Sequence, residues 1–306
     1  MFGAELPPPD AKAVAESEAQ GVRFSADRRT LLKGDPERLS GQYAVPDGVT
    51  AIGESAFSGC RDLESVKLPD SVRTVGNGAF YGCAKLTTVN IPEGVTAIGS
   101  WTFDECGALE RVSIPSTLKV VGCGAFARCE KLERLNLPEG LVEIRDSAFS
   151  DCSALKRLNI PSTVRVIGSG AFWSCDSLRS VDIPEGVTAV EYGTFEGCRG
   201  IVALTIPSTV LVIGGNAFWG CANLRSLYIP EGVTDIGEEA FSMCLKLIDV
   251  SLPSTLRSIG KMAFDGCERL AKVKIPAGVK VIGKGAFNRC PCEGTVGNAR
   301  PDDHRK

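Results

Sequence analysis

Histidine is almost absent from this sequence: the only one among 306 residues is His304, close to the C-terminus. A Ser-His-Asp triad or a His-based metal centre in the body of the chain is therefore excluded. Glycine-rich phosphate-binding motifs are also missing. We therefore expect a protein that is not an enzyme and that uses no cofactor and no metal.

Long apolar runs and an excess of positive charge are missing as well. No run approaches the roughly 18 to 20 apolar residues that cross a bilayer, so membrane insertion is not expected. The formal net charge of −3 gives no positive field to attract nucleic acid. The first 20 residues, "MFGAELPPPDAKAVAESEAQ", lack the basic and apolar regions of a secretory signal, which favours a cytoplasmic location.

A strict internal repeat dominates what is present. Cysteine recurs eleven times at intervals of 23 residues from Cys60 to Cys290, and phenylalanine does the same from Phe57 to Phe287. Such a period, without a single insertion, indicates one continuous solenoid and not two globular domains.

One copy of the repeat, "LESVKLPDSVRTVGNGAFYGC" at residues 63–83, can be read residue by residue. Alternation of Val66 and Leu68 with Lys67 predicts a short strand, and Pro69 ends it. The segment "AFYGC" is predicted to form one helical turn. Eight positions of the repeat are expected to face the interior: Leu63, Val66, Leu68, Val72, Val75, Ala79, Phe80 and Cys83.

The pattern L-x-x-V-x-I-P-x-x-V-x-x-I-G-x-x-A-F-x-x-C, held in register over residues 46–290, resembles the BspA-like subclass of leucine-rich repeats. The resemblance implies a solenoid of about eleven coils, with a parallel β-sheet on one face and short helical or irregular turns on the other. It also implies adhesion or protein–protein binding, often at a cell surface, so that a surface or secreted location is the alternative to the cytoplasm. Residues 21–45 are similar to the hairpin-like segment that often precedes such arrays and are expected to form an N-terminal cap. Residues 1–20 are expected to be flexible, and residues 291–306 form a polar tail without an apolar pattern to cover the last coil.

The repeated cysteines are interpreted as architecture. A spacing of 23 residues lays one thiol on each coil, whereas a zinc site needs its ligands in one local cluster. Free Cys is among the most buried residue types, so this column is predicted to be buried and reduced. Two cysteines outside the column, Cys123 and Cys292, are expected to be exposed.

Two further columns change along the array. Glutamates recur at intervals of 46 residues in alternate turns, which is best explained by duplication of a two-repeat unit: Glu93, Glu139, Glu185 and Glu231. Two glycines expected at the corner after each second strand are replaced by Arg145 and Glu191, for which the sequence suggests only a local distortion.

The candidate site lies in the outward strand positions, which differ from coil to coil. Three consecutive copies place arginine in one column, at Arg111, Arg134 and Arg157. Residues beside this column complete the predicted binding set: Lys156, Arg179, Asn136, Asn159, Asp182 and Tyr228. Either the arginines pair with Glu110 and Glu133, or they form a patch that binds an acidic segment of a protein partner. A more apolar stretch follows, with Val202, Ala203, Tyr228 and Ile248.

We therefore expect a non-enzymatic binding scaffold for protein partners, acting through the sheet face. The alternative is a structural or self-associating rod without a dedicated ligand. A third reading, a carbohydrate-binding module, needs an exposed aromatic platform, and the strand columns offer only Tyr43 and Tyr228. Trp173 and Trp219, on the opposite side of the coil, are the next candidates for a contact surface.

Overall fold

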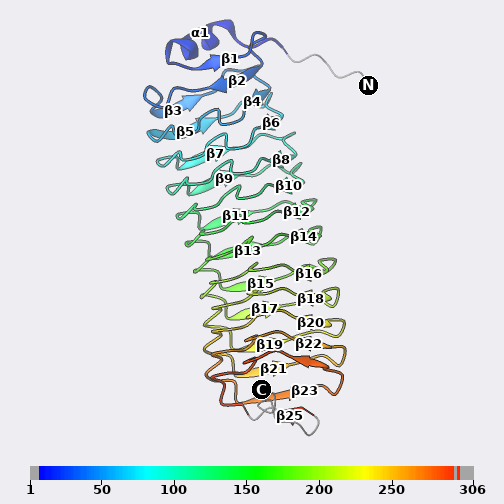
Figure 1. Cartoon of the computed structure of the whole chain (residues 1–306). Helices are drawn as coiled ribbons and strands as arrows, with labels where there is room; N and C mark the ends of the chain where they lie inside the picture. The colour runs from blue at the N-terminus through cyan, green and yellow to red at the C-terminus, as the bar shows by residue number, and fades with distance from the viewer. Residues whose placement is uncertain (1–6, 293–294, 297–306) are drawn as a thin grey trace, which may run out of the picture.

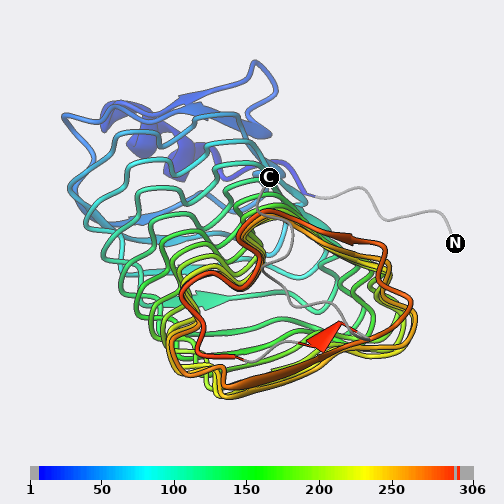
Figure 2. The ribbon, with the colours of Figure 1, turned by 60° about the horizontal axis from the view of Figure 1, so that its bottom comes forward.

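The chain folds into a rod of stacked coils in the computed structural model, which describes residues 7–292 and 295–296 (Figure 1). Each coil traces the same outline, and the outlines lie over one another around a common interior (Figure 2). Two columns of parallel strands run along the rod. The expected solenoid of about eleven coils, with parallel strands, is thereby confirmed.

One column of strands, which we call the first ladder, carries the segments ahead of each Pro-containing turn. Successive strands pair in parallel and in equivalent register, as in Arg134 with Arg157 and Asn136 with Asn159. The hydrogen-bonded groups are β3 to β9, β11 with β13, β15 with β17, and β19 to β25. The strands of the first ladder are β3 (Gly41–Ala44), β5 (Leu63–Lys67), β7 (Thr88–Asn90), β9 (Arg111–Ser113), β11 (Arg134–Asn136), β13 (Arg157–Asn159), β15 (Ser180–Asp182), β17 (Ala203–Thr205), β19 (Ser226–Tyr228), β21 (Asp249–Ser251), β23 (Lys272–Ile275) and β25 (Thr295–Val296).

The second ladder follows the Pro-containing turn of each coil and is made of shorter strands. It begins with an antiparallel hairpin of β1 and β2 and continues in parallel from β2 to β4. Its strands are β1 (Arg23–Phe24), β2 (Thr30–Lys33), β4 (Ala51–Ile52), β6 (Thr74–Val75), β8 (Ala97–Ile98), β10 (Val120–Val121), β12 (Glu143–Ile144), β14 (Val166–Ile167), β16 (Ala189–Val190), β18 (Val212–Ile213), β20 (Asp235–Ile236), β22 (Ser258–Ile259) and β24 (Val281–Ile282).

The interior is a continuous stack in which each inward residue meets its equivalent on the next coil. All eight positions predicted to face inward in residues 63–83 are buried. Neighbouring phenylalanine rings stack nearly parallel from Phe57 to Phe287, with centroids 5.1 to 5.5 Å apart. Tyr43 closes the stack edge-on against Phe57. Because each coil buries its apolar side chains only against its neighbours, the stability of a coil depends on both of them.

The side of the coil that contains "AFxxC" is not helical, which corrects the prediction of a helical turn. In residues 76–83 the N–H groups of Gly78, Phe80 and Gly82 donate to carbonyls of the next coil at 2.8 Å. The alternate N–H groups, such as that of Cys83, donate within the segment instead. Gly78 and Gly82 have left-handed φ values of 58° and 69°, which an α-helix does not contain. These linked turns form a third column of inter-coil hydrogen bonds.

A helix covers the N-terminal end of the rod, where a flexible segment was expected. Helix α1 (Ala11–Ala19) begins at Asp10, whose carboxylate accepts hydrogen bonds from the backbone N–H groups of Lys12 and Ala13. Its Val14 is fully buried. The structure thus places a helix within this segment, because a capped helix can bury an apolar side chain even in a short, charged stretch.

The C-terminal end of the described chain is less well covered than the middle. Strand β25 pairs with β23, Lys274 with Thr295 and Ile275 with Val296. Ile282, Phe287 and Cys290 are only partly buried, whereas their equivalents in the central coils are fully buried. The rest of the expected polar tail, including His304, lies outside the described residues.

At the corner after most strands of the second ladder the backbone of the preceding coil leaves little room for a Cβ atom, and glycine occupies the position. A Cβ on Gly76 would lie 2.6 Å from the backbone nitrogen of Glu54 in the preceding coil. Arg145 is nevertheless accommodated, and its backbone N–H still donates to Val121 at 3.0 Å. Next to Glu191 the pairing of β14 with β16 is interrupted. The same interruption between β6 and β8 occurs beside an ordinary Gly99, so the side chain of Glu191 is not a sufficient cause.

Candidate binding face of the first ladder

The outward positions of the first ladder form the candidate site. All nine residues predicted from the sequence are exposed. Seven of them lie on β9, β11, β13, β15 and β19, which follow one another along the rod (Figure 1), and Lys156 and Arg179 directly precede β13 and β15. The register places Arg134 beside Arg157 and Asn136 beside Asn159. Strand β9, with Arg111, lies next to β11. The structure thus brings the three arginines into one row, which we call the arginine row.

The arginine row is not neutralised by the neighbouring carboxylates. Glu133 binds Lys156 of the next coil, with 2.7 Å between Oε1 and Nζ. This hydrogen bond, helped by the charges of Lys156 and Arg134, lowers the pKa of Glu133. Among the ion pairs of residues 7–292, none involves Arg111, Arg134 or Arg157. Of the two readings left open by the sequence, the pairing of the arginines with Glu110 and Glu133 is therefore not found in the described chain.

Two asparagine amides lie beside the arginine row, and a carboxylate lies on the coil that follows it. Asn136 and Asn159 lie two residues beyond Arg134 and Arg157 on the same strands, so that their amides stand next to the guanidinium groups. On the following coil Asp182 accepts a hydrogen bond from the Thr205 hydroxyl at 2.7 Å. Exposed carboxylates therefore lie on both sides of the basic stretch: Glu110 directly before Arg111, and Asp182 on the coil after Arg157, where Arg179 is also exposed.

The second half of the face adds exposed apolar side chains to the polar ones. Tyr228 is 62% exposed, and Val202 and Ile248 are also exposed. The other tyrosine of the predicted aromatic platform, Tyr43, is only 6% exposed. The expectation for Tyr43 was wrong because Tyr43 lies 23 residues before the inward Val66 and aligns with it, so both occupy the same inward column. The aromatic surface of the first ladder is thus a single tyrosine, which is too small for the stacking platform of a carbohydrate module.

The cysteine column holds the coils together from inside. Each thiol from Cys83 onward donates a hydrogen bond to the carbonyl of the phenylalanine in the preceding coil, for example Cys175 to Phe149 at 3.2 Å. Burial raises the pKa of several of these thiols, to about 12 at Cys106 and Cys152. A protonated thiol is what this hydrogen bond needs, because the thiolate has no proton to donate. Cys123 and Cys292, expected to be exposed, are instead half-buried, as is Cys290.

Alternate Pro-containing turns interlock in pairs. In one pair, Glu93 accepts hydrogen bonds from both the backbone N–H and the hydroxyl of Ser116 at 2.9 Å. The hydroxyl of Thr117 accepts from Gly94 N–H and donates to the Val95 carbonyl. Glu231 and Ser254 repeat the arrangement three pairs further on. The side chains of Glu93, Glu139 and Glu231 therefore connect neighbouring coils. No cluster of three or more His, Cys, Asp or Glu residues able to hold a metal occurs in the described chain.

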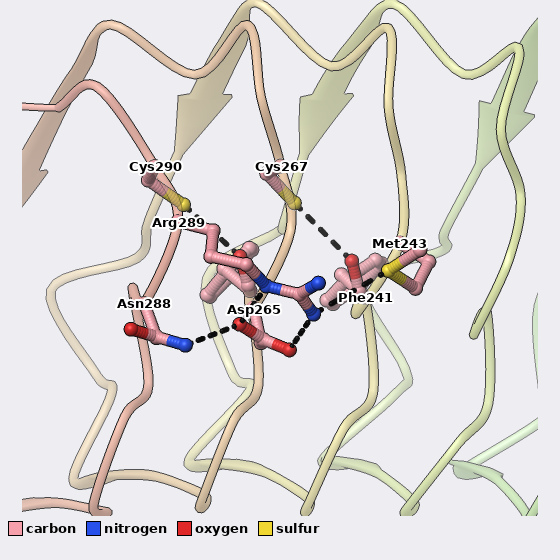
Figure 3. Close-up of polar contacts among 8 residues, drawn as sticks. Phe241, Met243, Asp265, Cys267, Asn288, Arg289 and Cys290 are labelled. Carbon is pink, nitrogen blue, oxygen red and sulfur yellow. Dashed lines mark hydrogen bonds and ion pairs between the residues drawn. The ribbon is translucent and has the colours of Figure 1, made fainter.

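A charged pair sits on the side of the linked turns. Asp265 is nearly buried and is held by the next coil: Asn288 Nδ2 and Arg289 Nε both donate to Oδ1 at 3.0 Å, and the Arg289 guanidinium also reaches Oδ2 (Figure 3). These hydrogen bonds lower the pKa of Asp265. Arg289 additionally contacts the sulfur of Met243, two coils away (Figure 3). Three successive coils are thus connected at one surface point.

Sequence reasoning overlooked an aromatic hollow on this side of the rod. Tyr81, Trp101, Glu54, Asn77 and Asp104 line it. The sequence carries one weak signal for it: Trp101 occupies a column that otherwise holds mainly small residues. In the structure Trp101 adopts a left-handed φ of 55°. Of the two tryptophans singled out from the sequence, Trp173 is exposed and Trp219 is half-buried.

The sequence also matches a known family over most of its length. The model described as "BspA type Leucine rich repeat region (6 copies)" matches residues 42–156, 96–224 and 165–294. The chain belongs to the BspA-type leucine-rich repeat family. The resemblance drawn from the repeat pattern is thereby confirmed. No curated protein sequence matches this BspA-type chain.

Solved structures of similar fold come from bacteria. A leucine-rich repeat protein from Bacteroides ovatus is 24% identical, with a TM-score of 0.63 over 88% of this BspA-type chain and 90% of its own. The pneumococcal vaccine antigen PcpA is also 24% identical, with a TM-score of 0.63 over 86% and 75% of the two chains. A leucine-rich cell surface protein from Faecalibacterium prausnitzii is 25% identical, with a TM-score of 0.55 over 90% and 92%. No helix of the described residues is long and apolar enough to span a membrane.

Proposed function

We propose that this protein is a non-enzymatic scaffold that binds a protein partner through the outward face of the first ladder. The leucine-rich repeat family to which it belongs is consistent with a protein-binding or adhesion role. The solenoid of these repeats is typically non-enzymatic. Its stacked coils offer a rigid surface whose inward residues stay constant while its outward residues vary.

The observation that carries the proposal is the composition of this face. The arginine row has no intramolecular ion pair in the described chain, and exposed Val202, Tyr228 and Ile248 follow two, three and four coils beyond Arg157. Arginine and tyrosine are enriched where proteins bind one another, since guanidinium binds carboxylates in a two-pronged geometry and the phenol ring buries a large area. The arginine row would bind an acidic segment of the partner, and the apolar half would pack against its apolar side chains.

Two structural relatives give the proposal a setting. One is described as a cell surface protein and another as a vaccine antigen. These descriptions support adhesion at a cell surface as one place where such a face would meet its partner.

The test is affinity capture with the intact chain, from cell lysate and from surface extracts, compared with a double variant. Arg134→Glu with Arg157→Glu should leave the circular dichroism spectrum and Tm unchanged, because both side chains are exposed. The same variant should lose the captured partner and weaken the salt dependence of binding. Capture of the same partner by both proteins would move the binding surface away from the arginine row, with Trp173 and the aromatic hollow as the next candidates.

A further inference from the structure

The spacing of the arginine row suggests what kind of acidic segment it fits. The phenylalanines that precede Arg111, Arg134 and Arg157, one on each coil, are Phe103, Phe126 and Phe149, and their rings are 5.3 and 5.4 Å apart. Strands β11 and β13 are paired, and paired strands lie about 4.7 to 4.9 Å apart, while β9 lies next to β11 without ladder hydrogen bonds between them. The three guanidinium groups therefore project at intervals of about 5 Å, and the row spans roughly 10 Å along the rod.

An α-helix matches this interval. Its pitch is about 5.4 Å, so carboxylates at positions i, i+4 and i+7 lie on one stripe that is about 10.5 Å long. An extended strand matches poorly, because its side chains return to the same face only every 6.6 to 6.8 Å or so, and three of them span roughly 13 Å. From this geometry we infer that the arginine row recognises the acidic stripe of an α-helix lying along the rod axis. The inference rests on the proposed function and names its partner more closely.

The charges around the row select against a long polyanion. Exposed carboxylates lie close to the row: Glu110 directly precedes Arg111, Glu133 precedes Arg134 and is bound by Lys156, and Asp182 lies on the coil after Arg157, where Arg179 is also exposed. A nucleic acid or a sulfated polysaccharide running along the row would pass Glu110 and Asp182, which repel its negative charge. A helix can restrict its carboxylates to two turns and place lysines opposite the flanking acids. The amides of Asn136 and Asn159 can donate further hydrogen bonds to the same carboxylates.

The test uses short peptides whose helical form is fixed by a side-chain lactam bridge and whose binding is followed by fluorescence anisotropy. One peptide carries Glu at i, i+4 and i+7. A second has the same composition with the three Glu spread around the helix, and a third, extended peptide carries them at i, i+2 and i+4. We expect the striped helix to bind at least about 10-fold more tightly than either of the others, since only it offers three charge-assisted hydrogen bonds at once.

Variants show whether the arginine row is responsible. Arg134→Glu with Arg157→Glu should abolish the preference for the striped helix. A matched control reverses two exposed basic residues of the same face outside the row, Arg225→Glu and Lys272→Glu, and should leave the preference intact. Lys272 is a suitable control because it occupies the same column as the row, on β23.

Each contrary outcome has its own meaning. Equal binding of all three peptides, lost on reversal of Arg134 and Arg157, would overturn the helical inference and leave the proposed acidic partner standing. Binding that is unchanged by the reversal of Arg134 and Arg157 would overturn both the helical inference and the proposed acidic partner. Tighter binding of a single-stranded oligonucleotide or a heparin fragment at physiological salt would replace the helix with a polyanion.

Discussion

Asp104 and Asp265 occupy the same position of the repeat, and only one of them has both carboxylate oxygens bound. Asp265 accepts hydrogen bonds at Oδ1 from Asn288 and Arg289, whereas Oδ1 of Asp104 is buried and has no partner. Oδ2 of Asp104 binds Arg128 at 2.7 Å, as Oδ2 of Asp265 binds Arg289. The difference between the two sites is the residue that precedes the arginine, which is Asn288 in one coil and Ala127 in the other.

Ala127→Asn should therefore stabilise the protein. The new amide would supply the missing donor to Asp104 Oδ1, and a satisfied buried acceptor contributes about 1 kcal/mol to the free energy of unfolding. Urea denaturation measures the change. Asn288→Ala is the reciprocal control and should destabilise, since Asp265 then keeps only Arg289. A less stable Ala127→Asn protein would show that the linked turns have no room for the amide.

The same two carboxylates should respond to acid in opposite directions. Burial raises the pKa of Asp104, while the hydrogen bonds from Arg289 and Asn288 lower that of Asp265. A lowered pKa gives stability that is present near neutral pH and lost as the pH falls, and a raised pKa gives the reverse. The stability of the wild type relative to Asp265→Asn should thus fall on acidification toward about pH 3, and its stability relative to Asp104→Asn should rise. Thermal melts over this range measure both differences, and a change of both in the same direction would contradict the assignment.

Thiol labelling of the native protein should separate the cysteines into two groups. The ten ladder thiols from Cys60 to Cys267 are fully buried, and burial raises the pKa of Cys106, for example, to about 12, so the reactive thiolate is scarce. Only the half-buried Cys123, Cys290 and Cys292 should react without denaturant. Cys290 should be the slowest of these, because its pKa is raised to about 12, chiefly by its contact with Cys267. Mass spectrometry counts the labels, and modification of many ladder thiols in the folded state would refute the architectural role.

Removal of one ring from the phenylalanine stack should be felt by two neighbours. Phe172 lies 5.5 Å from Phe149 and 5.2 Å from Phe195, measured between ring centroids. Phe172→Ala should cost about 3 to 5 kcal/mol in free energy of unfolding. Asn159→Ala, on the outward face, should cost no more than about 0.5 kcal/mol. Similar melting of the two variants would mean that the inward and outward columns had been assigned incorrectly.

Much of this fold could be predicted from the sequence because a strict period repeats each inward position eleven times. The linked turns could not, since Ala79, Phe80 and Cys83 share one side both in a helical turn and in the observed arrangement. What separates the two is the destination of the N–H groups, and only the neighbouring coil determines it. Tyr43 could have been placed correctly, because the period of 23 residues aligns it with the inward Val66.

The candidate site shows a similar limit. The repeat columns of the sequence predict the arginine row. They do not show directly that Glu133 forms its ion pair with Lys156 of the next coil and not with Arg134. Opposite charges one repeat apart do carry a signal, because the same contact occurs between Asp62 and Lys85 and between Glu238 and Lys261. Such pairs can be found in a repeat sequence by comparing each charged residue with the one 23 positions later.

The hydrogen bonds between coils, described above for three sides of the rod, all run along its long axis. A force that pulls the two ends apart therefore acts across every interface between coils. The outermost coil, which has only one neighbour, should detach first. The rod should yield by peeling, one coil at a time and at low force, and each event should release roughly 70 to 75 Å of chain. Extension in a single-molecule experiment would then proceed in regular steps, so that a rigid binding surface would also act as a tether that lengthens under load.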